Sequence, residues 1–250
     1  MVTKHRNFKM EWAKIHLDTL KVSVATLVSD PDNMYRVLKE EDFYRQLFIV
    51  TIMSINDIEL VKISLIAGDF ICNLRASLDH LAWKLATIGK KRPSAETCFP
   101  IISKILPRTE AKVAERIAAC TGGIDPEAVA LMKTFQPYNS GDAYKSHHLW
   151  RLHFLWNLDK HRNISIHSAD SGTVCEIPLG VPRTHQQFND RAIVSIPLSA
   201  KTKVRFNPSL SPKILFGDED RGVQVTLQDF SDIYEFVSTE VFPAFARFIP

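Results

Sequence analysis

The spacing of hydrophobic residues changes twice in the first quarter of the chain. From Arg6 to about Val28, apolar residues recur at helical intervals, at Phe8, Trp12 and Ile15 and then at Leu20, Val24 and Leu27. Between Met34 and Ile55 they give way to β-branched and aromatic residues on both sides of a polar stretch, Lys39–Asp42. The pattern predicts an N-terminal helix with polar residues between the apolar ones, followed by a two-stranded hairpin that turns at this polar stretch.

A long helix is predicted next. Asn56 is a good N-cap, Glu59 follows three residues later as in a capping box, and Gly89 comes directly after Ile88. At 1.5 Å per residue, a helix ending at Ile88 would be roughly 45–50 Å long. We expect it to be the central helix of the protein.

Shorter elements follow the long helix. Helices are expected over 109–120, from Pro126 to just before Pro137, and over 146–162. The chain then becomes rich in short apolar runs separated by Pro, Gly and Asn, which is typical of an antiparallel sheet. These runs are Ile164–His167, Val174–Ile177, Ala192–Leu198, Lys203–Phe206 and Ile214–Phe216. A closing helix is expected from Leu227 to Phe248, with a kink at Pro243.

The predicted fold class is α+β, a helical bundle core with a small antiparallel sheet that lies mostly in the C-terminal third. Residues 1–162 are expected to form a mainly helical core with an N-terminal hairpin. Residues 163–250 are expected to form a β-rich segment plus the closing helix, and the whole to make one compact domain. Composition agrees, because 45% hydrophobic and 24% charged residues exclude disordered, collagenous and coiled-coil chains.

Charge and cysteine usage indicate the compartment. The first twenty residues carry several charged side chains, and the apolar runs are too short for a membrane span, so we expect a cytoplasmic bacterial protein without a membrane partner. The four cysteines lie more than twenty residues apart without a Cys-x-x-Cys pair, which predicts reduced, buried thiols. They are Cys72, Cys98, Cys120 and Cys175.

Polar residues crowd one stretch of the long helix, from Asn73 to Trp83. A helical projection places Asp69, Asn73 and His80 within about 40° of one another, opposite an apolar face. That apolar face consists of Phe70, Leu74, Leu78, Leu81 and Leu85. Arg75 and Asp79 form a neighbouring i, i+4 column, which is either a solvated ion pair or part of a polar site.

A second polar edge lies on the predicted helix 146–162. His153, Asn157 and His161 follow one another at i, i+4 and i+8. Such histidines are either hydrogen-bonded structural residues or members of a site. If the two polar edges face each other, we expect Asp79 or His80 to lie within hydrogen-bonding reach of Asp159, His161 or Arg162, since buried polar groups need partners.

Three blocks of sequence resemble a bacterial protein family for which no activity is established. They are Asn73-Leu74-Arg75-x-x-Leu78-Asp79-His80-Leu81-x-Trp83, then Phe135-Gln136-Pro137-Tyr138, then Asn157-x-Asp159-Lys160-His161-Arg162. The resemblance covers roughly residues 60–165. It implies no particular reaction.

Arg75-x4-His80 also resembles the Arg-x4-6-His motif of the HEPN helical domains, many of which are metal-independent endoribonucleases. This resemblance implies RNA as a partner and a homodimer in which Arg75 and His80 of each subunit line one cleft. His80 would be the catalytic acid or base, and catalytic Arg75 would neutralise the phosphate. Supporting residues would be Asp69, Asn73, Asp79, His153, Asn157, Asp159, His161 and Arg162. Ala76 and the β-rich third depart from the family's pattern.

Whether the chain is an enzyme stays open at this point. An excess of Lys and Arg between Arg75 and Arg116, nine against four Asp and Glu, is compatible with RNA binding. One alternative is a non-enzymatic binding or regulatory module in which both motifs form a structural polar network. Another is a metal-dependent hydrolase with ligands from Asp79, His80, His153, Asp159 and His161, although no His-Glu-x-x-His or Glu-x-x-His pair is present. We expect no cofactor.

Overall fold

The computed structural model describes most of the chain and confirms an α+β fold. The described residues are 7–29, 35–54, 57–89, 92–105, 109–161, 164–169, 175–176, 180–187, 191–203, 205–206, 213–218 and 221–249. The chain divides into two compact units, which are described separately. The first comprises residues 1–20, 64–165 and 216–250, and the second comprises residues 21–63 and 166–215.

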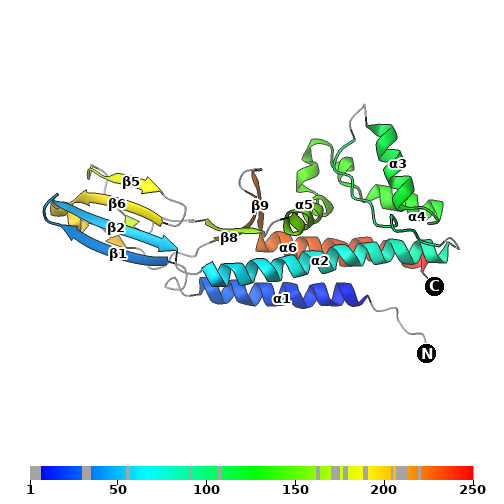
Figure 1. Cartoon of the computed structure of the whole chain (residues 1–250), viewed down its shortest axis with the longest axis horizontal. Coiled ribbons are helices and arrows are strands. Elements are labelled where there is room, and N and C mark those ends of the chain that lie inside the picture. The colour runs from blue at the N-terminus through cyan, green and yellow to red at the C-terminus, as the bar shows by residue number, and fades with distance from the viewer. Residues whose placement is uncertain are drawn as a thin grey trace. The chain divides into compact units, whose positions relative to one another are not determined.

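The first unit is built around the predicted long helix, α2 (Asp57–Ile88). The apolar face predicted for it is buried, as the exposures of 0–3% from Phe70 to Leu85 show. Phe70 packs against Phe230 of α6 (Leu227–Glu235), with ring centroids 5.5 Å apart. α1 (Phe8–Val28) lies along α2 on another side, as Figure 1 shows. The expected N-cap of α2, Asn56, lies outside the described residues.

The three shorter helices predicted for this unit form close to their predicted positions, as α3 (Glu110–Cys120), α4 (Pro126–Thr134) and α5 (His148–His161). The 3₁₀ segment η2 (Pro137–Ser146), between α4 and α5, was not predicted. Asp125 caps α4 as its side chain accepts a hydrogen bond of 2.8 Å from the N–H of Glu127, with Pro126 at the first helical position. The segment 92–105 connects to this region without regular structure.

The predicted closing helix is interrupted near Pro243. α6 begins at Leu227 as expected, with a complete capping box between Thr226 and Asp229. It continues as the π-helical segment η4 (Phe236–Val241), then as α7 (Phe242–Ala244) and the 3₁₀ turn η5 (Ala246–Phe248). Pro243 has no N–H to donate to the preceding turn, which accounts for the change of register there.

The second unit contains a four-stranded antiparallel sheet. Its strands are β1 (Tyr35–Asp42), β2 (Leu47–Ser54), β6 (Arg191–Pro197) and β5 (Thr184–Gln187), in the order β1-β2-β6-β5. Phe48 and Val50 of β2 bury their side chains with Ile196 and Ala200, the latter in the 3₁₀ segment η3 (Leu198–Lys203). The structure therefore groups the N-terminal hairpin with the later strands, whereas the sequence order suggested grouping it with the helices.

The hairpin turn lies four residues after its predicted position. Lys39–Asp42, the expected turn, belongs to β1, and the turn is formed by residues 43–46. Asp42 stabilises it by accepting a 2.8 Å hydrogen bond from the N–H of Arg45, and Gln46 adopts a φ of 55°. A charged run is compatible with a strand here because these side chains are exposed or only half-buried.

Two smaller sheets use the remaining strands. β3 (Ser165–Ala169), β8 (Lys213–Asp218) and β9 (Val223–Thr226) form a three-stranded sheet in the order β3-β8-β9. β4 (Cys175–Glu176) pairs with β7 (Arg205–Phe206). Within the described residues, no helix combines the length and the apolar character that crossing a bilayer requires.

Candidate functional site

Arg75 lies in a buried network and not in an open cleft. Its side chain is 7% exposed. One guanidinium nitrogen, Nη1, donates to Oδ1 of Asp79 at 2.6 Å, and the other, Nη2, donates to the carbonyl of Phe99 at 2.9 Å. The N–H of Phe99 in turn donates to Oδ1 of Asp79 at 3.0 Å. These three bonds join α2 to both backbone polar groups of one residue in the segment 92–105.

Aromatic rings cover this network from α5 and from the C-terminal region. The guanidinium carbon of Arg75 lies 5.5 Å from the ring centroid of Trp156, a cation–π arrangement. Phe99 is fully buried and packs edge-on against Phe245, with centroids 6.2 Å apart. Arg75 therefore connects α2, α5 and the segment 92–105 at one point.

Gln136 of the Phe-Gln-Pro-Tyr block forms further hydrogen bonds with the segment 92–105. It is 1% exposed, and its Nε2 donates to the carbonyls of Pro100 and Met132 at 2.8 and 3.0 Å. Its Oε1 accepts the N–H of Ile102 at 2.9 Å. Residues of two of the three sequence blocks thus provide hydrogen-bond partners for backbone groups of the segment 92–105. This segment has no regular secondary structure to pair them, and buried peptide groups need partners.

His153 is a neutral structural residue beside this network. Its ring stacks on Trp156 with centroids 5.8 Å apart, and its Nδ1 is buried without a hydrogen-bond partner in the described part of the chain. Burial, together with the nearby charges of Arg75 and Arg116, lowers the pKa of His153 to about 4. It cannot serve as a proton donor near neutral pH.

The depressed pKa of His153 makes stability depend on pH. Between pH 6.5 and about 4, an unfolded chain binds a proton at His153 that the folded chain does not, so acid favours unfolding in this window. We expect the free energy of unfolding to fall with pH by up to about 1 kcal/mol per pH unit from this residue. Urea titrations across the window should show a shallower slope for His153→Phe. His161→Phe, at an exposed position, is the matched control, and an equal slope in all three proteins would contradict the assignment.

α2 and α5 face each other, in a register that differs from the predicted one. Trp156 of α5 meets Arg75, and Asp159 meets Gly68 and Cys72, so the two helices run antiparallel. A Cβ on Gly68 would collide with the Asp159 carboxylate, and the thiol of Cys72 donates to Oδ2 of Asp159 at 3.5 Å. Burial raises the pKa of Asp159 and that of Cys72, the latter to about 11.

The remaining polar residues do not converge on one pocket. In the described ranges, neither Asp79 nor His80 forms a hydrogen bond with Asp159 or His161; Arg162 lies outside these ranges. Nδ2 of Asn157 donates to the carbonyl of His153 at 2.9 Å, and His161 and Asp69 are exposed. Nδ2 of Asn73 likewise donates to the carbonyl of Asp69 at 2.8 Å, so both asparagines pair within their own helix.

His80 lies apart from Arg75, exposed at the rim of a pocket. Positions i and i+5 of a helix differ by about 140° in direction. Arg75 therefore faces the interior while His80 faces α1. The expectation that both line one cleft is not met within this chain.

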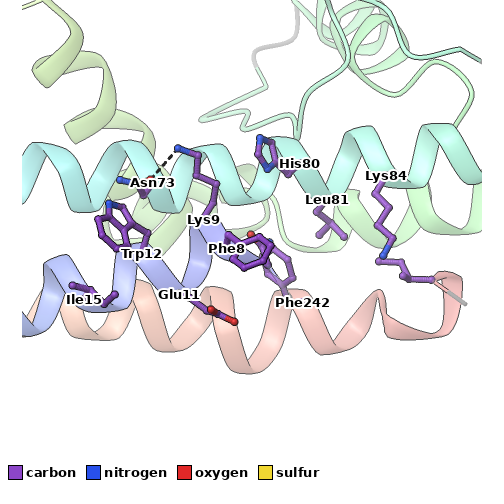
Figure 2. Close-up of a pocket in the computed structure, with 12 residues that line it drawn as sticks. Phe8, Lys9, Glu11, Trp12, Ile15, Asn73, His80, Leu81, Lys84 and Phe242 are labelled. Carbon is purple, nitrogen blue, oxygen red and sulfur yellow. Dashed lines mark hydrogen bonds between the residues drawn. The ribbon is translucent and has the colours of Figure 1, made fainter. Parts of the chain in front are cut away.

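The pocket has a volume of about 770 Å³ and is mostly apolar. It lies between the first two turns of α1, one face of α2 and the C-terminal region (Figure 2). Its lining consists of Asn7, Phe8, Lys9, Glu11, Trp12, Ile15, Asn73, His80, Leu81, Lys84, Phe242 and Ile249. A volume of this size is in the range of small-molecule and cofactor sites, roughly 300–1,000 Å³.

Three apolar side chains that α1 contributes to the pocket are exposed. Phe8, Trp12 and Ile15 are 72%, 53% and 49% exposed. The later residues of the same predicted spacing, Leu20, Val24 and Leu27, are buried, together with Met10, Ala13 and Leu17. α1 thus carries two apolar stripes, and the second stripe is an uncovered surface.

Two lysines and a histidine line the pocket beside these rings. Nζ of Lys9 donates to Oδ1 of Asn73 at 3.1 Å, and His80 and Lys84 lie one turn apart on α2 (Figure 2). Desolvation lowers the pKa of Lys84. Glu11 is the acidic residue of the lining. The pocket therefore offers flat apolar surface beside three groups that can donate to an anion.

A second hollow of about 720 Å³ adjoins the first. His80 and Lys84 line both, so these two side chains form the ridge between them. Trp83 and Ile88, 49% and 39% exposed, provide apolar surface on its far side. A ligand longer than one ring system can thus extend over the ridge from Trp12 towards Trp83.

The metal-hydrolase alternative finds little support in this geometry. In the ranges that the structure describes, no three His, Cys, Asp or Glu side chains are grouped as a metal ion would need. Among the ligands considered, His153 is buried beside Arg75, Asp159 contacts Cys72, and His161 is exposed.

Comparisons with known proteins add no assignment. No protein-family model, curated protein or solved structure matches the chain. The geometry of its residues is therefore what indicates its function.

Proposed function

We propose that this protein binds single-stranded RNA in the pocket between α1 and α2, and that it does not cleave RNA with Arg75 and His80. The observation that carries the proposal is the exposure of Phe8 and Trp12 beside Lys9, His80 and Lys84. Aromatic rings interleaved with cations are the usual surface for single-stranded nucleic acids.

Each part of the pocket has a counterpart in such a ligand. A base has a flat face that can stack on Trp12 or Phe8, which contributes about 1–3 kcal/mol per base. A phosphate can accept from His80 and Lys84, which lie on the ridge between the two hollows. Trp83, on the far side of that ridge, is placed for a neighbouring base.

Binding without cleavage follows from the position of Arg75. A guanidinium that stabilises a reacting phosphate must reach it, whereas this guanidinium is buried and bonded to Asp79 and the Phe99 carbonyl. His80 alone supplies an imidazole without the charge partner that the motif requires. All pocket residues come from one chain, so the homodimer that the HEPN resemblance implies is not needed for this site.

A salt titration tests the proposal through Lys84. Because each neutralised phosphate releases counterions, log Kd rises linearly with log salt concentration. We expect Lys84→Gln to weaken binding of a fluorescein-labelled oligouridylate and to lower this slope by about one. Lys112→Gln, at an exposed position of α3 outside the pocket, should leave both the affinity and the slope unchanged. Equal slopes for wild type and Lys84→Gln, or an absence of binding at low salt, would overturn the proposal.

A further inference from the structure

Two cysteines that are distant in sequence lie side by side in the first unit. The Sγ atoms of Cys98 and Cys120 are 3.1 Å apart. The N–H of Cys98 also donates to the carbonyl of Cys120 at 3.2 Å. Cys98 belongs to the segment 92–105, and Cys120 is the last residue of α3. The two residues are therefore close enough, in both backbone and side chain, for a disulfide to form between them.

We infer that Cys98 and Cys120 are a redox-active thiol pair that forms a reversible disulfide. A disulfide has an S–S distance of about 2.05 Å, so the two sulfur atoms need to approach by only about 1 Å. The bond would close a loop of residues 98–120, which joins the segment 92–105 to the end of α3. The RNA pocket contains neither cysteine, so this inference does not depend on the proposed function.

The two thiols differ in a way that suits them to complementary steps. Cys98 is partly exposed, so a small oxidant or reductant can reach it, whereas Cys120 is 2% exposed. The hydrogen bond from Cys98, with the nearby charges of Arg116 and Arg75, lowers the pKa of Cys120 to about 7. Cys120 therefore supplies a thiolate at neutral pH, already directed at the sulfur of Cys98.

The oxidation balances with a peroxide as oxidant. Hydrogen peroxide oxidises the thiolate of one cysteine of the pair to a sulfenic acid and is itself reduced to one water. The sulfur of the other cysteine then attacks the sulfenic sulfur, and the departing hydroxide takes up the proton of that second thiol to form a second water. In total two thiols lose two protons and two electrons, and the peroxide O–O bond is broken. A dithiol reductant such as dithiothreitol restores both thiols by exchange.

The structural consequence falls on the segment that Arg75 and Gln136 hold. The backbone of Phe99, the residue after Cys98, accepts a hydrogen bond from Arg75 and donates one to Asp79. A disulfide at position 98 would add a covalent tie beside these bonds. Oxidation should therefore stabilise the folded state, because it restricts the unfolded chain without displacing the segment.

Peptide mapping of the full-length protein tests the pair directly. After treatment with equimolar hydrogen peroxide, we expect the intact mass to fall by about 2 Da and a non-reducing digest to contain the peptide pair linked through Cys98 and Cys120. The melting temperature should rise by about 5 °C or more and return on reduction. Cys98→Ser and Cys120→Ala should each abolish the mass loss, while Cys72→Ser, at an exposed thiol, should retain it.

Other products would overturn the inference. They include a sulfinic acid at Cys98, a link from Cys98 to Cys72 or Cys175, a link between chains, or thiols that survive the treatment. Because the wild-type map is decisive by itself, poor folding of a cysteine variant does not weaken the test.

Discussion

Replacing Arg75 by methionine should lower the free energy of unfolding by about 2–4 kcal/mol. The substitution leaves the Phe99 carbonyl without its donor and Asp79 without its cation, and Phe99 is fully buried. Asp79 is one-third exposed, which keeps the expected loss below that of a fully buried pair. Urea denaturation followed by circular dichroism measures the change.

His80→Ala is the matched control, since His80 is exposed on the same helix five residues away. It should change the free energy of unfolding by less than about 0.5 kcal/mol. A double variant, Arg75→Met with Asp79→Leu, should recover part of the loss because no buried charge remains unpaired. If Arg75→Met is as stable as wild type but no longer binds RNA, Arg75 belongs to the ligand site and not to the core.

Replacing Trp12 by alanine should weaken binding of single-stranded RNA by about 5- to 150-fold. The ring is half-exposed at the pocket, so its loss removes a stacking surface while little core packing changes. The melting temperature should therefore stay close to that of wild type. Fluorescence anisotropy of a labelled oligouridylate at low salt gives the dissociation constants.

Tyr44→Ala provides an aromatic control in the other unit. Tyr44 is 97% exposed, lies in the hairpin turn and is not a lining residue of the pocket. We expect it to bind RNA as wild type does. Equal affinity for wild type and Trp12→Ala would show that RNA does not stack in this pocket.

The buried face of α2 was predictable, whereas the partners of its polar residues were not. Helical periodicity predicts that Leu74 and Leu78 are buried, whichever elements pack against them. The partner of Asp79 depends instead on the segment 92–105, which has no periodic pattern, and Phe99 reaches it from twenty residues away. Local pattern specifies a face of a helix, but only packing specifies which backbone group meets it.

The pocket-lining side of α1 could not be recognised from the sequence for a related reason. Phe8 and Trp12 follow a helical spacing that is equally compatible with a core face or with an uncovered binding face. Met10, Ala13 and Leu17 form a second apolar stripe, and this is the one that packs. The sequence did contain one signal for an exposed apolar face, namely two apolar stripes on one terminal helix. A helix that packs on one side buries only one of them.

The cysteine pair and the hairpin turn show the same limit at shorter range. Cys98 and Cys120 are twenty-two residues apart and share no motif, so sequence spacing alone predicts isolated thiols, as it did. The four charged residues Lys39–Asp42 have the composition of a turn, which is why the turn was predicted there. The turn forms instead at residues 43–46, where the Asp42 side chain accepts a hydrogen bond from the N–H of Arg45.

Photocrosslinking is the most direct test that the α1–α2 pocket holds RNA. An oligonucleotide with 4-thiouridine would be bound to the wild-type protein, irradiated, and its adducts mapped by mass spectrometry, with the recovered RNA checked for cleavage. We expect adducts on Phe8–Trp12 and His80–Lys84, intact RNA, and loss of the adducts in Trp12→Ala. Adducts confined to other surfaces, or RNA cut in wild type and spared in His80→Ala, would contradict the proposed binding role.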